Sequence, residues 1–306
     1  MPASRPDLDA IAPAPGWEQL PGRIAGGAAM LLGATGTGKT HLALWLCQRL
    51  RDLGAAPALL CADVGQPVIG VPGAMALASR LHHPPETLWF VGDISPARNL
   101  LPVAVGAGML AKSAERSGAR SLVVDTTGLV APPLGHLLKY HKAFATGVTH
   151  LIAIQQAGEL EPLLSLLDSF VRRVHRLSPA EAVGTRPPED RRAYRQDAFR
   201  AHLAGGAVQR YPPAKLIDAN WTTPGTGTEL QAGTLLGLLD EQGYCLSLAV
   251  ATGVTQDAVE VHTAWAEPER VARIQLGRLL LSPGGVELGR PSSLSLKHAD
   301  TARRFT

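Results

Sequence analysis

The chain has 306 residues, of which 45% are hydrophobic and 18% are charged, a balance typical of a folded protein with a substantial core. This composition excludes a largely disordered chain, and no apolar run reaches the roughly 20 residues that a membrane-spanning helix needs. The three cysteines lie far apart and form no CxxC pair, which argues against a zinc cluster. The first 15 residues lack the pattern of a signal peptide, so we expect a cytoplasmic protein without a membrane partner.

The net charge of +3 is concentrated in one segment of the chain. Residues 172–200 contain eight arginines and four acidic residues, so this stretch alone holds an excess of four positive charges. A local basic excess favours a polyanion partner held near it, and a solvated helix face is the alternative interpretation. The same two interpretations apply to Lys139, His141 and Lys142 on a predicted helix, which could contact a nucleic acid backbone or simply face solvent.

Up to about residue 204, short apolar runs alternate with longer amphipathic ones, which predicts βαβ units and a mostly parallel sheet flanked by helices. The expected strands are Ala28–Leu32, Ala58–Ala62, Leu88–Val91, Ser121–Val124, His150–Ile154 and Val171–Leu177. The expected helices are Lys39–Leu53, Leu101–Ser117, Leu134–Ala145 and Leu160–Asp168. Further strands are expected within Tyr244–Ala249, Ala258–His262 and Arg273–Leu281. We therefore expect an α/β fold with a strap at 1–22, a main domain at 23–204 and a small β-rich C-terminal domain at 205–306.

A phosphate-binding motif follows the first predicted strand. The motif, which fits GxxxxGK[ST], consists of Gly33, Ala34, Thr35, Gly36, Thr37, Gly38, Lys39 and Thr40, and His41 comes next. Its glycines let backbone N–H groups turn inward around anionic oxygens, and the positive end of the following helix adds to the field. The lysine of this motif reaches the outer phosphates, and its last hydroxyl ligates magnesium. The chain is therefore predicted to be a P-loop NTPase that binds ATP with Mg²⁺.

A magnesium site of this kind also needs a carboxylate at the end of a neighbouring strand. Asp63 and Asp125 each follow a predicted strand, and either could hold metal-bound water or act as a base toward an incoming hydroxyl. A carboxylate that only caps a strand-to-loop turn is the alternative for both. The stretch Asp125–Gly128 also matches the DxxG switch of GTPases, but Ile154–Ala157 stands where a guanine-specificity motif is expected, which disfavours a GTPase.

Several further motifs follow these in a fixed order. They are Pro15-Gly16-Trp17 before the phosphate loop, Asp63-Val64-Gly65-Gln66, Val71-Pro72-Gly73-Ala74-Met75, Gly92–Asn99, Asp125–Gly128, the Arg-rich Thr185–Arg192, Leu276-Gly277-Arg278 and Gly285-Val286-Glu287. This order, spread over roughly residues 17–287, resembles the P-loop polynucleotide 5′-hydroxyl kinases. That group includes the kinase subunit of the mRNA 3′-end cleavage machinery, the pre-rRNA-processing kinases and their archaeal relatives. The resemblance corresponds to a compact form without the large N-terminal domain of the eukaryotic members.

The resemblance implies an ATP- and Mg²⁺-dependent enzyme of RNA processing that transfers the γ-phosphate to the 5′-hydroxyl of RNA or DNA. It implies catalytic roles for Lys39 and Asp63, and for Arg186 and Arg191 in a lid at about 178–200. It also implies that Thr40 and Asp63 hold the metal ion. The substrate-binding residues that it implies are Gln66, Asn99, Asp125, Thr126, Thr127 and Gly128.

The chain departs from the family pattern at three positions. Cys61 replaces the first acid of an Asp-x-Asp pair, Leu129 stands where a stacking Trp is common, and Ala97 replaces a Thr. An aromatic platform contributes about 1–3 kcal/mol per stacked base, so its loss bears on the acceptor side. Two alternatives therefore stay open, an ATP-binding scaffold without transfer activity and a kinase or ATPase acting on a small molecule. The sequence leaves the oligomeric state open.

Overall fold

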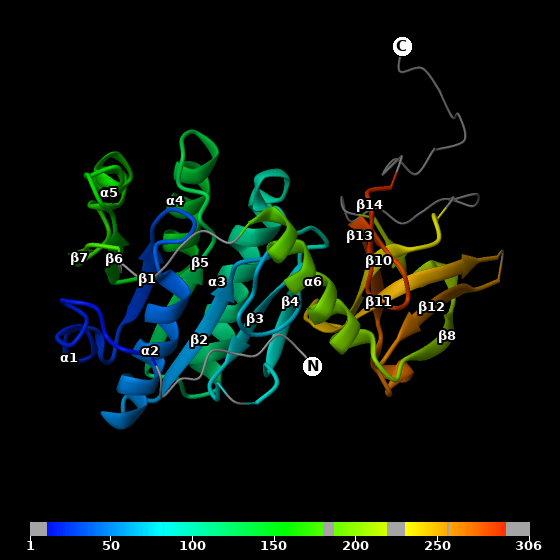
Figure 1. The fold of residues 1–306 in the computed structure, drawn as a ribbon. Coiled ribbons are helices and arrows are strands. Elements are labelled where there is room, and N and C mark those ends of the chain that lie inside the picture. The colour runs from blue at the N-terminus through cyan, green and yellow to red at the C-terminus, as the bar shows by residue number, and fades with distance from the viewer. Residues whose placement is uncertain (1–10, 82, 180–186, 219–229, 256, 292–306) are drawn as a thin grey trace, which may run out of the picture. The chain divides into compact units, whose positions relative to one another are not determined.

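The computed structural model describes residues 11–81, 83–179, 187–218, 230–255 and 257–291 (Figure 1). Contacts between Cα atoms divide the chain into two compact units, Met1–Arg195 and Gln196–Thr306. The division falls inside helix α6 (Pro188–Leu203). The domain boundary after residue 204 stays a prediction. Among the described residues, no helix combines the length and the apolar character needed to cross a bilayer.

The first unit is a layered α/β structure. In chain order it contains α1 (Leu20–Ile24), β1 (Ala28–Leu32), α2 (Lys39–Asp52), β2 (Pro57–Ala62), β3 (Ala74–Ala78), β4 (Thr87–Phe90), the 3₁₀-helix η1 (Pro96–Arg98), α3 (Leu100–Arg116), β5 (Ser121–Thr126), α4 (Leu134–Thr146), β6 (His150–Ile154), α5 (Glu161–Leu167), β7 (Arg173–Leu177) and the start of α6. The strands pair in the order β4-β3-β2-β5-β1-β6-β7. Helix α2 covers one face of this sheet, and α3 and α4 cover the other (Figure 1).

The sheet is parallel from β2 to β7, which confirms the predicted mostly parallel sheet flanked by helices. Parallel strands are buried on both faces and therefore read as continuous apolar runs, which is why the sequence located them. Strand β3 was not predicted, and it pairs antiparallel with both β2 and β4. Its sequence, Ala-Met-Ala-Leu-Ala, has little intrinsic strand preference and follows Gly73, so only its two neighbours determine its conformation.

The strand order brings three strand ends together. β5 lies between β2 and β1, with Cys61 of β2 beside Asp125 and Ala62 beside Thr126. On the other side of β5, Met30 of β1 lies beside Val124. The phosphate loop, the turn at Asp63 and the loop after β5 therefore all begin at one edge, the carboxyl edge where open α/β sheets bind ligands.

The second unit is built from short strands. After the end of α6 it contains β8 (Ala207–Tyr211), η2 (Pro213–Lys215), β9 (Leu216–Ile217), β10 (Thr234–Leu239), β11 (Cys245–Val254), β12 (Val259–Thr263), η3 (Pro268–Arg270), β13 (Arg273–Leu281) and β14 (Glu287–Gly289). Antiparallel pairs connect β14, β13, β10, β11, β12 and β8, and β9 pairs parallel with β13. Leu236, Leu238, Val261 and Ile274 belong to its buried core. The strands expected in this part of the sequence are present as β11, β12 and β13.

Candidate functional site

The loop between β1 and α2 has a backbone that its glycines make possible. Gly36 and Gly38 have φ angles of 79° and 90°, in the left-handed region that glycine adopts without steric cost. Gly38 is the N-cap of α2 and none of the described side chains caps this helix, so its first N–H groups remain for an anion. A Cβ added to Gly128 would lie 2.5 Å from the Thr35 nitrogen, so the loop after β5 packs directly on the phosphate loop. His41 lies in the first turn of α2 and is half-buried.

Lys39 is buried at the first position of α2. Its Nζ donates a hydrogen bond of 2.6 Å to the Ala34 carbonyl, which also accepts one of 3.0 Å from Thr37 Oγ1. Burial lowers the pKa of Lys39, while the charges of Asp125 and Asp63 act to raise it. The ammonium group is therefore held at the phosphate loop with two carboxylates nearby, the position that the motif requires.

Asp125, on β5, is the carboxylate in contact with the phosphate loop. Its Oδ2 accepts a hydrogen bond of 2.9 Å from Thr40 Oγ1, and its Oδ1 is buried without a hydrogen-bond partner among the described residues. Burial and then Asp63 raise the pKa of Asp125 to about 6, against the effects of Lys39, Thr40 and Lys139. A buried carboxylate oxygen without a donor is costly, and Mg²⁺ prefers carboxylate and hydroxyl oxygens. The residues present at this point therefore fit a magnesium ion.

Asp63 begins the turn after β2, and one of its oxygens holds that turn. Asp63 Oδ1 accepts hydrogen bonds from the N–H groups of Gly65 at 2.9 Å and Gln66 at 3.0 Å. Such an Asx-type turn fixes the carboxylate relative to the backbone, and Oδ2 lies outside these bonds. Gln66 Nε2 is buried and has no hydrogen-bond partner within the described part of the chain. Asp63 and Gln66 thus each present one polar atom that their own turn does not use.

Three predicted residues follow Asp125: Thr126 is the last residue of β5, and Thr127 and Gly128 lie in the loop after it. Thr126 Oγ1 donates a hydrogen bond of 2.7 Å to the Leu31 carbonyl of β1, so this hydroxyl ties two strand ends together. Thr127 Oγ1 is buried and finds no hydrogen-bond partner in the described ranges. Gly128 makes the close approach to the phosphate loop given above. Thr127 is therefore the member of this loop with an unused polar atom.

Asn99 holds the loop that precedes α3. Its Nδ2 donates hydrogen bonds to the Ser95 carbonyl at 3.0 Å and to Asp93 Oδ2 at 3.3 Å. Asn99 and Asp93 are both buried. The amide nitrogen of Asn99 is thus engaged within its own loop, and its role in substrate binding stays a prediction.

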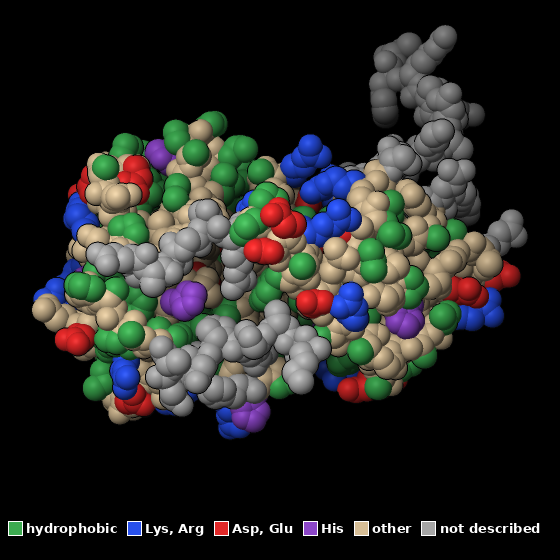
Figure 2. All heavy atoms as spheres, in the orientation of Figure 1, with side chains coloured by type: hydrophobic (Ala, Val, Ile, Leu, Met, Phe, Trp, Pro, Cys, Tyr) green, Lys and Arg blue, Asp and Glu red, His purple; other side chains and the backbone are tan. Residues whose placement is uncertain are grey.

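Of the two predicted lid arginines, Arg186 lies outside the described residues, and Arg191 lies near the start of α6. One turn further, Tyr194 donates a hydrogen bond of 2.6 Å to the Pro67 carbonyl, just beyond the turn that begins at Asp63. This bond attaches the helix that carries Arg191 to the loop after β2. Acidic and basic side chains stand side by side over α6 in Figure 2, so the basic excess of this segment is partly neutralised on the helix itself. Sequence reasoning missed Tyr194, whose only signal was an aromatic residue inside an Arg-rich run.

The positions of Lys139 and Lys142 differ from those expected from the sequence. The sequence placed them on a solvated face or against a nucleic acid backbone, but both side chains are 0% exposed. Lys139 Nζ donates hydrogen bonds of 2.6 Å to Thr126 Oγ1 and to the Thr127 carbonyl, and Lys142 Nζ lies 3.4 Å from the Ala62 carbonyl. Both expectations for these lysines were wrong, because tertiary packing turns this face of α4 toward the sheet.

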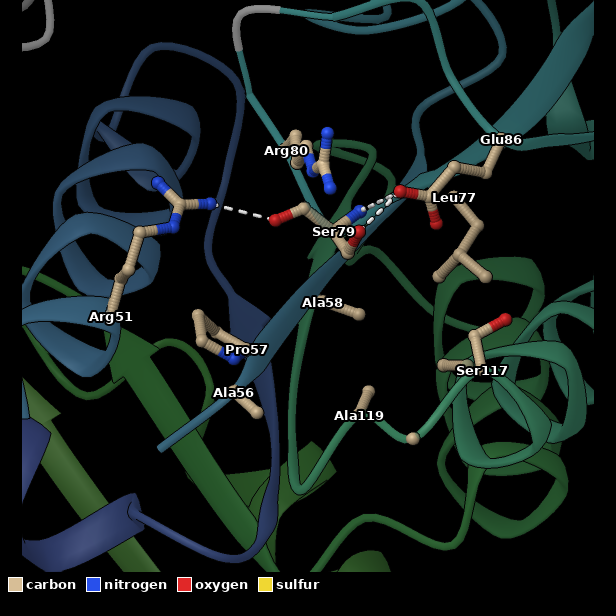
Figure 3. A pocket seen from close by; sticks show the side chains of 12 residues that line it. Arg51, Ala56, Pro57, Ala58, Leu77, Ser79, Arg80, Glu86, Ser117 and Ala119 are labelled. Atoms are coloured by element: carbon tan, nitrogen blue, oxygen red, sulfur yellow. Dashed lines mark hydrogen bonds between the residues drawn. The ribbon is translucent and has the colours of Figure 1, made fainter. Parts of the chain in front are cut away.

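A hollow of about 240 Å³ lies away from these residues, at the amino ends of β2 and β5 (Figure 3). Its polar groups include Arg51, which donates to the Ser79 carbonyl at 2.7 Å, and Glu86, which accepts from the Ser79 N–H at 3.2 Å (Figure 3). Because its lining excludes every predicted site residue, and ligands of such sheets bind at the carboxyl ends, the candidate site remains at the phosphate loop.

Comparison with known proteins identifies the family of this chain. A model of the family described as mRNA cleavage and polyadenylation factor CLP1 P-loop matches residues 33–205. The polyribonucleotide 5′-hydroxyl-kinase of Pyrococcus furiosus is 24% identical, with 85% of this chain and 89% of that protein covered. The enzyme of the same name from Methanocaldococcus jannaschii is 29% identical, with 85% and 88% covered.

A solved structure supports the fold. A chain of the Clp1p–Pcf11p complex superimposes with a TM-score of 0.65 over 86% of this chain and 78% of its own length. The sequence identity is 13%, so this match concerns the fold alone.

Proposed function

The chain belongs to the family described as mRNA cleavage and polyadenylation factor CLP1 P-loop, and from this we propose that it is an ATP-dependent kinase of polynucleotide 5′-hydroxyl groups. Nucleotide binding follows from the P-loop of the family. The acceptor is supported by the similar proteins, which are named polyribonucleotide 5′-hydroxyl-kinases. The basic excess at 172–200 also suits a polyanion.

One observation carries the proposal: at the phosphate loop, beside Thr40, Asp125 has a buried oxygen that no described residue pairs, while Asp63 stands at the next strand end. Lys39 and the loop amides would bind the triphosphate. Thr40 and Asp125 would hold Mg²⁺, while Asp63, the carboxylate that the resemblance implies for the metal, would serve as the base. A bound Mg²⁺ ion would neutralise part of the negative charge of the phosphates.

In the transfer step, the acceptor 5′-oxygen forms a bond to the γ-phosphorus while the bond from that phosphorus to the ADP oxygen breaks. The hydroxyl proton passes to the carboxylate of Asp63. Its Oδ1 is anchored by the turn, and Oδ2 lies outside those hydrogen bonds. Gln66 Nε2 and Thr127 Oγ1 would bind the acceptor. Arg191, with Arg186 outside the described residues, would neutralise charge in the transition state, and the lid would exclude water.

The proposal is tested with purified protein, Mg²⁺ and ATP labelled at the γ-phosphate. The acceptors are one RNA and one DNA oligonucleotide, each with a 5′-hydroxyl, and the matched controls are the same strands already carrying a 5′-phosphate. We expect label on the 5′-hydroxyl strands only. ATP binding without transfer to either strand would contradict the proposal and favour a scaffold, and ATP turnover with a small hydroxyl compound alone would favour a small-molecule kinase.

A further inference from the structure

Helix α4 buries the side chains that a surface helix normally exposes. Lys139 and Lys142 are three residues apart, so they share one face of the helix, and both are fully buried. Positions on the outer face carry Leu137, which is 48% exposed, and Phe144, which is 71% exposed. Burying an ammonium group costs free energy unless other groups compensate it. An apolar residue would avoid that cost, so two lysines here need a specific role.

Each lysine contacts a different strand end of the candidate site. Lys139 Nζ donates to Thr126 Oγ1 and to the Thr127 carbonyl, both at 2.6 Å, directly after Asp125. Lys142 Nζ approaches the carbonyl of Ala62, the last residue of β2, at 3.4 Å. The two lysines thus reach the two strand ends that carry the carboxylates of the site.

The contact of Lys139 extends to the strand of the phosphate loop. Thr126 Oγ1 accepts a hydrogen bond from Lys139 Nζ and donates one of 2.7 Å to the Leu31 carbonyl of β1. This chain of hydrogen bonds joins α4, the end of β5 and the end of β1. The contact of Lys142 is simpler, because Ala62 is covalently bonded to Asp63.

The two carboxylates of the site offset part of the cost of burying the lysines. Burial, then Lys142 and Lys39, hold the pKa of Lys139 well below its ordinary value, while Asp63 and Asp125 act to raise it. Burial lowers the pKa of Lys142 to about 8, and the same two carboxylates oppose that change. Three lysine side chains and two carboxylates therefore lie in one electrostatically coupled cluster.

Direct contact with the substrate does not account for these lysines. Both are 0% exposed, so neither ammonium group reaches a phosphate in this conformation. Their hydrogen bonds end on backbone and hydroxyl groups that flank Asp63 and Asp125. Their effect on a reaction would therefore act through those carboxylates.

We propose that Lys139 and Lys142 are positioning residues for phosphoryl transfer. Lys139 holds the loop after Asp125 against the strand of the phosphate loop, and Lys142 holds the end of β2 from which Asp63 projects. This inference rests on the proposed kinase function and assigns two residues that the motifs of the sequence do not include.

The test replaces Lys142 by Met, which keeps a long side chain and removes the charge, in the full-length protein. We expect the kcat of transfer to an RNA 5′-hydroxyl to fall about tenfold to a hundredfold, the size expected for a misplaced reacting group. The KM for ATP from the transfer assay stays near that of the wild type. The affinity for ADP, measured by calorimetry, also stays near the wild-type value. The unfolding temperature does not fall, because the variant no longer buries a charge.

The second variant, Lys139→Met, should also lower kcat, with a lower unfolding temperature because the Thr127 carbonyl loses its donor. The matched control is Lys215→Met, since Lys215 Nζ also donates to a backbone carbonyl, that of Val271, in the second unit. That variant should keep the wild-type kcat. If Lys142→Met does not fold, Lys142→Gln replaces it, because glutamine keeps a donor for the Ala62 carbonyl without a charge.

Two results would overturn the inference while the kinase function stands. One is an unchanged kcat in the Lys142 variant of an active enzyme. The other is a Lys142 variant in which ADP affinity and the unfolding temperature fall together with kcat, because such a combined loss indicates general damage to the fold. A wild-type protein that transfers no phosphate would instead contradict the proposed function itself, and the inference would fall with it.

Discussion

The ends of β2 and β5 lie side by side and each carries an aspartate, yet the two carboxylates are held in opposite ways. At the end of β2, Asp63 is half-buried and two backbone N–H groups anchor one of its oxygens. At the end of β5, Asp125 is fully buried and accepts only a threonine hydroxyl bond, with its other oxygen unpaired within the described ranges. Asp63 is therefore oriented and accessible, while Asp125 is desolvated and keeps one oxygen without a hydrogen-bond donor among the described residues.

This difference teaches that equivalent positions on neighbouring strands can have different tasks. A carboxylate fixed by its own turn, with one oxygen outside that turn, suits proton transfer from an acceptor hydroxyl. A buried carboxylate that contacts the Thr40 hydroxyl suits a cation.

Asp63→Asn is expected to have the largest effect. The amide oxygen of asparagine can still accept the N–H groups of Gly65 and Gln66, so the turn should persist while the proton acceptor is lost. We expect kcat to fall by about 10³, within the range for general base catalysis, with ADP affinity nearly unchanged. Single-turnover transfer and calorimetry measure the two quantities.

Asp240→Asn is the matched control for this variant. Asp240 Oδ1 also accepts hydrogen bonds from two backbone N–H groups, those of Gln242 and Tyr244, both at 2.9 Å, in the second unit. The control should retain the wild-type kcat. Equal losses of kcat and ADP affinity in Asp63→Asn would contradict the role of Asp63 as the base.

Asp125→Asn is expected to change the pH dependence of stability. Burial, then the Asp63 charge, raise the pKa of Asp125 to about 6 in the folded protein, against about 3.9 for an unfolded chain. The folded state therefore binds more protons at Asp125 between these values, so the contribution of this carboxyl to stability is fully present at low pH and is lost as the pH rises through 6.

That loss should amount to about 2–3 kcal/mol in the wild type without metal, and it should be absent in the variant. Urea unfolding from pH 4.5 to 7 in the presence of a chelator measures it, with the difference between the two proteins as the readout. If the free energy of unfolding changed with pH in the same way for the wild type and the variant, the pKa of Asp125 would not be raised by its surroundings.

Arg191→Ala should lower the rate of transfer at least about tenfold, the size of one charge-assisted hydrogen bond of about 1.5–3 kcal/mol. ADP affinity should change much less, since lid charge acts chiefly in the transition state. Arg200→Ala on the same helix, which removes an exposed ion pair with Asp197, is the control. If Arg191→Ala weakened binding and rate to the same degree, the lid assignment would be wrong.

Tyr194→Phe should have the smallest effect. It removes the hydrogen bond from the start of α6 to the Pro67 carbonyl, which contributes about 0.5–1.5 kcal/mol. The rate of transfer should fall by no more than about tenfold, because the aromatic ring still packs and only the anchor is lost. Tyr211→Phe, which removes a hydroxyl bonded to Gln209 in the second unit, should leave the rate unchanged.

The parts of the site that the sequence predicted are those encoded locally. The phosphate loop is a contiguous motif whose glycines have one structural purpose, and β1 and α2 on either side of it begin where they were predicted. Asp63 and Asp125 could be found because each follows an apolar strand. Which of the two touches Thr40 depends on strand order, and no local pattern records that.

The parts that the sequence missed depend on tertiary packing. A lysine in an amphipathic pattern is assigned to the solvent face, because isolated charges rarely enter a core. Lys139 and Lys142 reverse that rule because carboxylates at two strand ends compensate them. Tyr194 was missed for a related reason, since its partner, the Pro67 carbonyl, lies 127 residues earlier in the chain.

A magnesium titration of phosphate transfer in two variants, Asp63→Asn and Asp125→Asn, tests the division of roles most directly. Both are assayed at saturating ATP and RNA acceptor beside the wild type. If Asp125 binds the metal and Asp63 is the base, Asp125→Asn needs a higher Mg²⁺ concentration for half-maximal transfer. Asp63→Asn then keeps the wild-type midpoint at a much lower maximal rate. A shifted midpoint in Asp63→Asn together with an unshifted one in Asp125→Asn would contradict that division of roles.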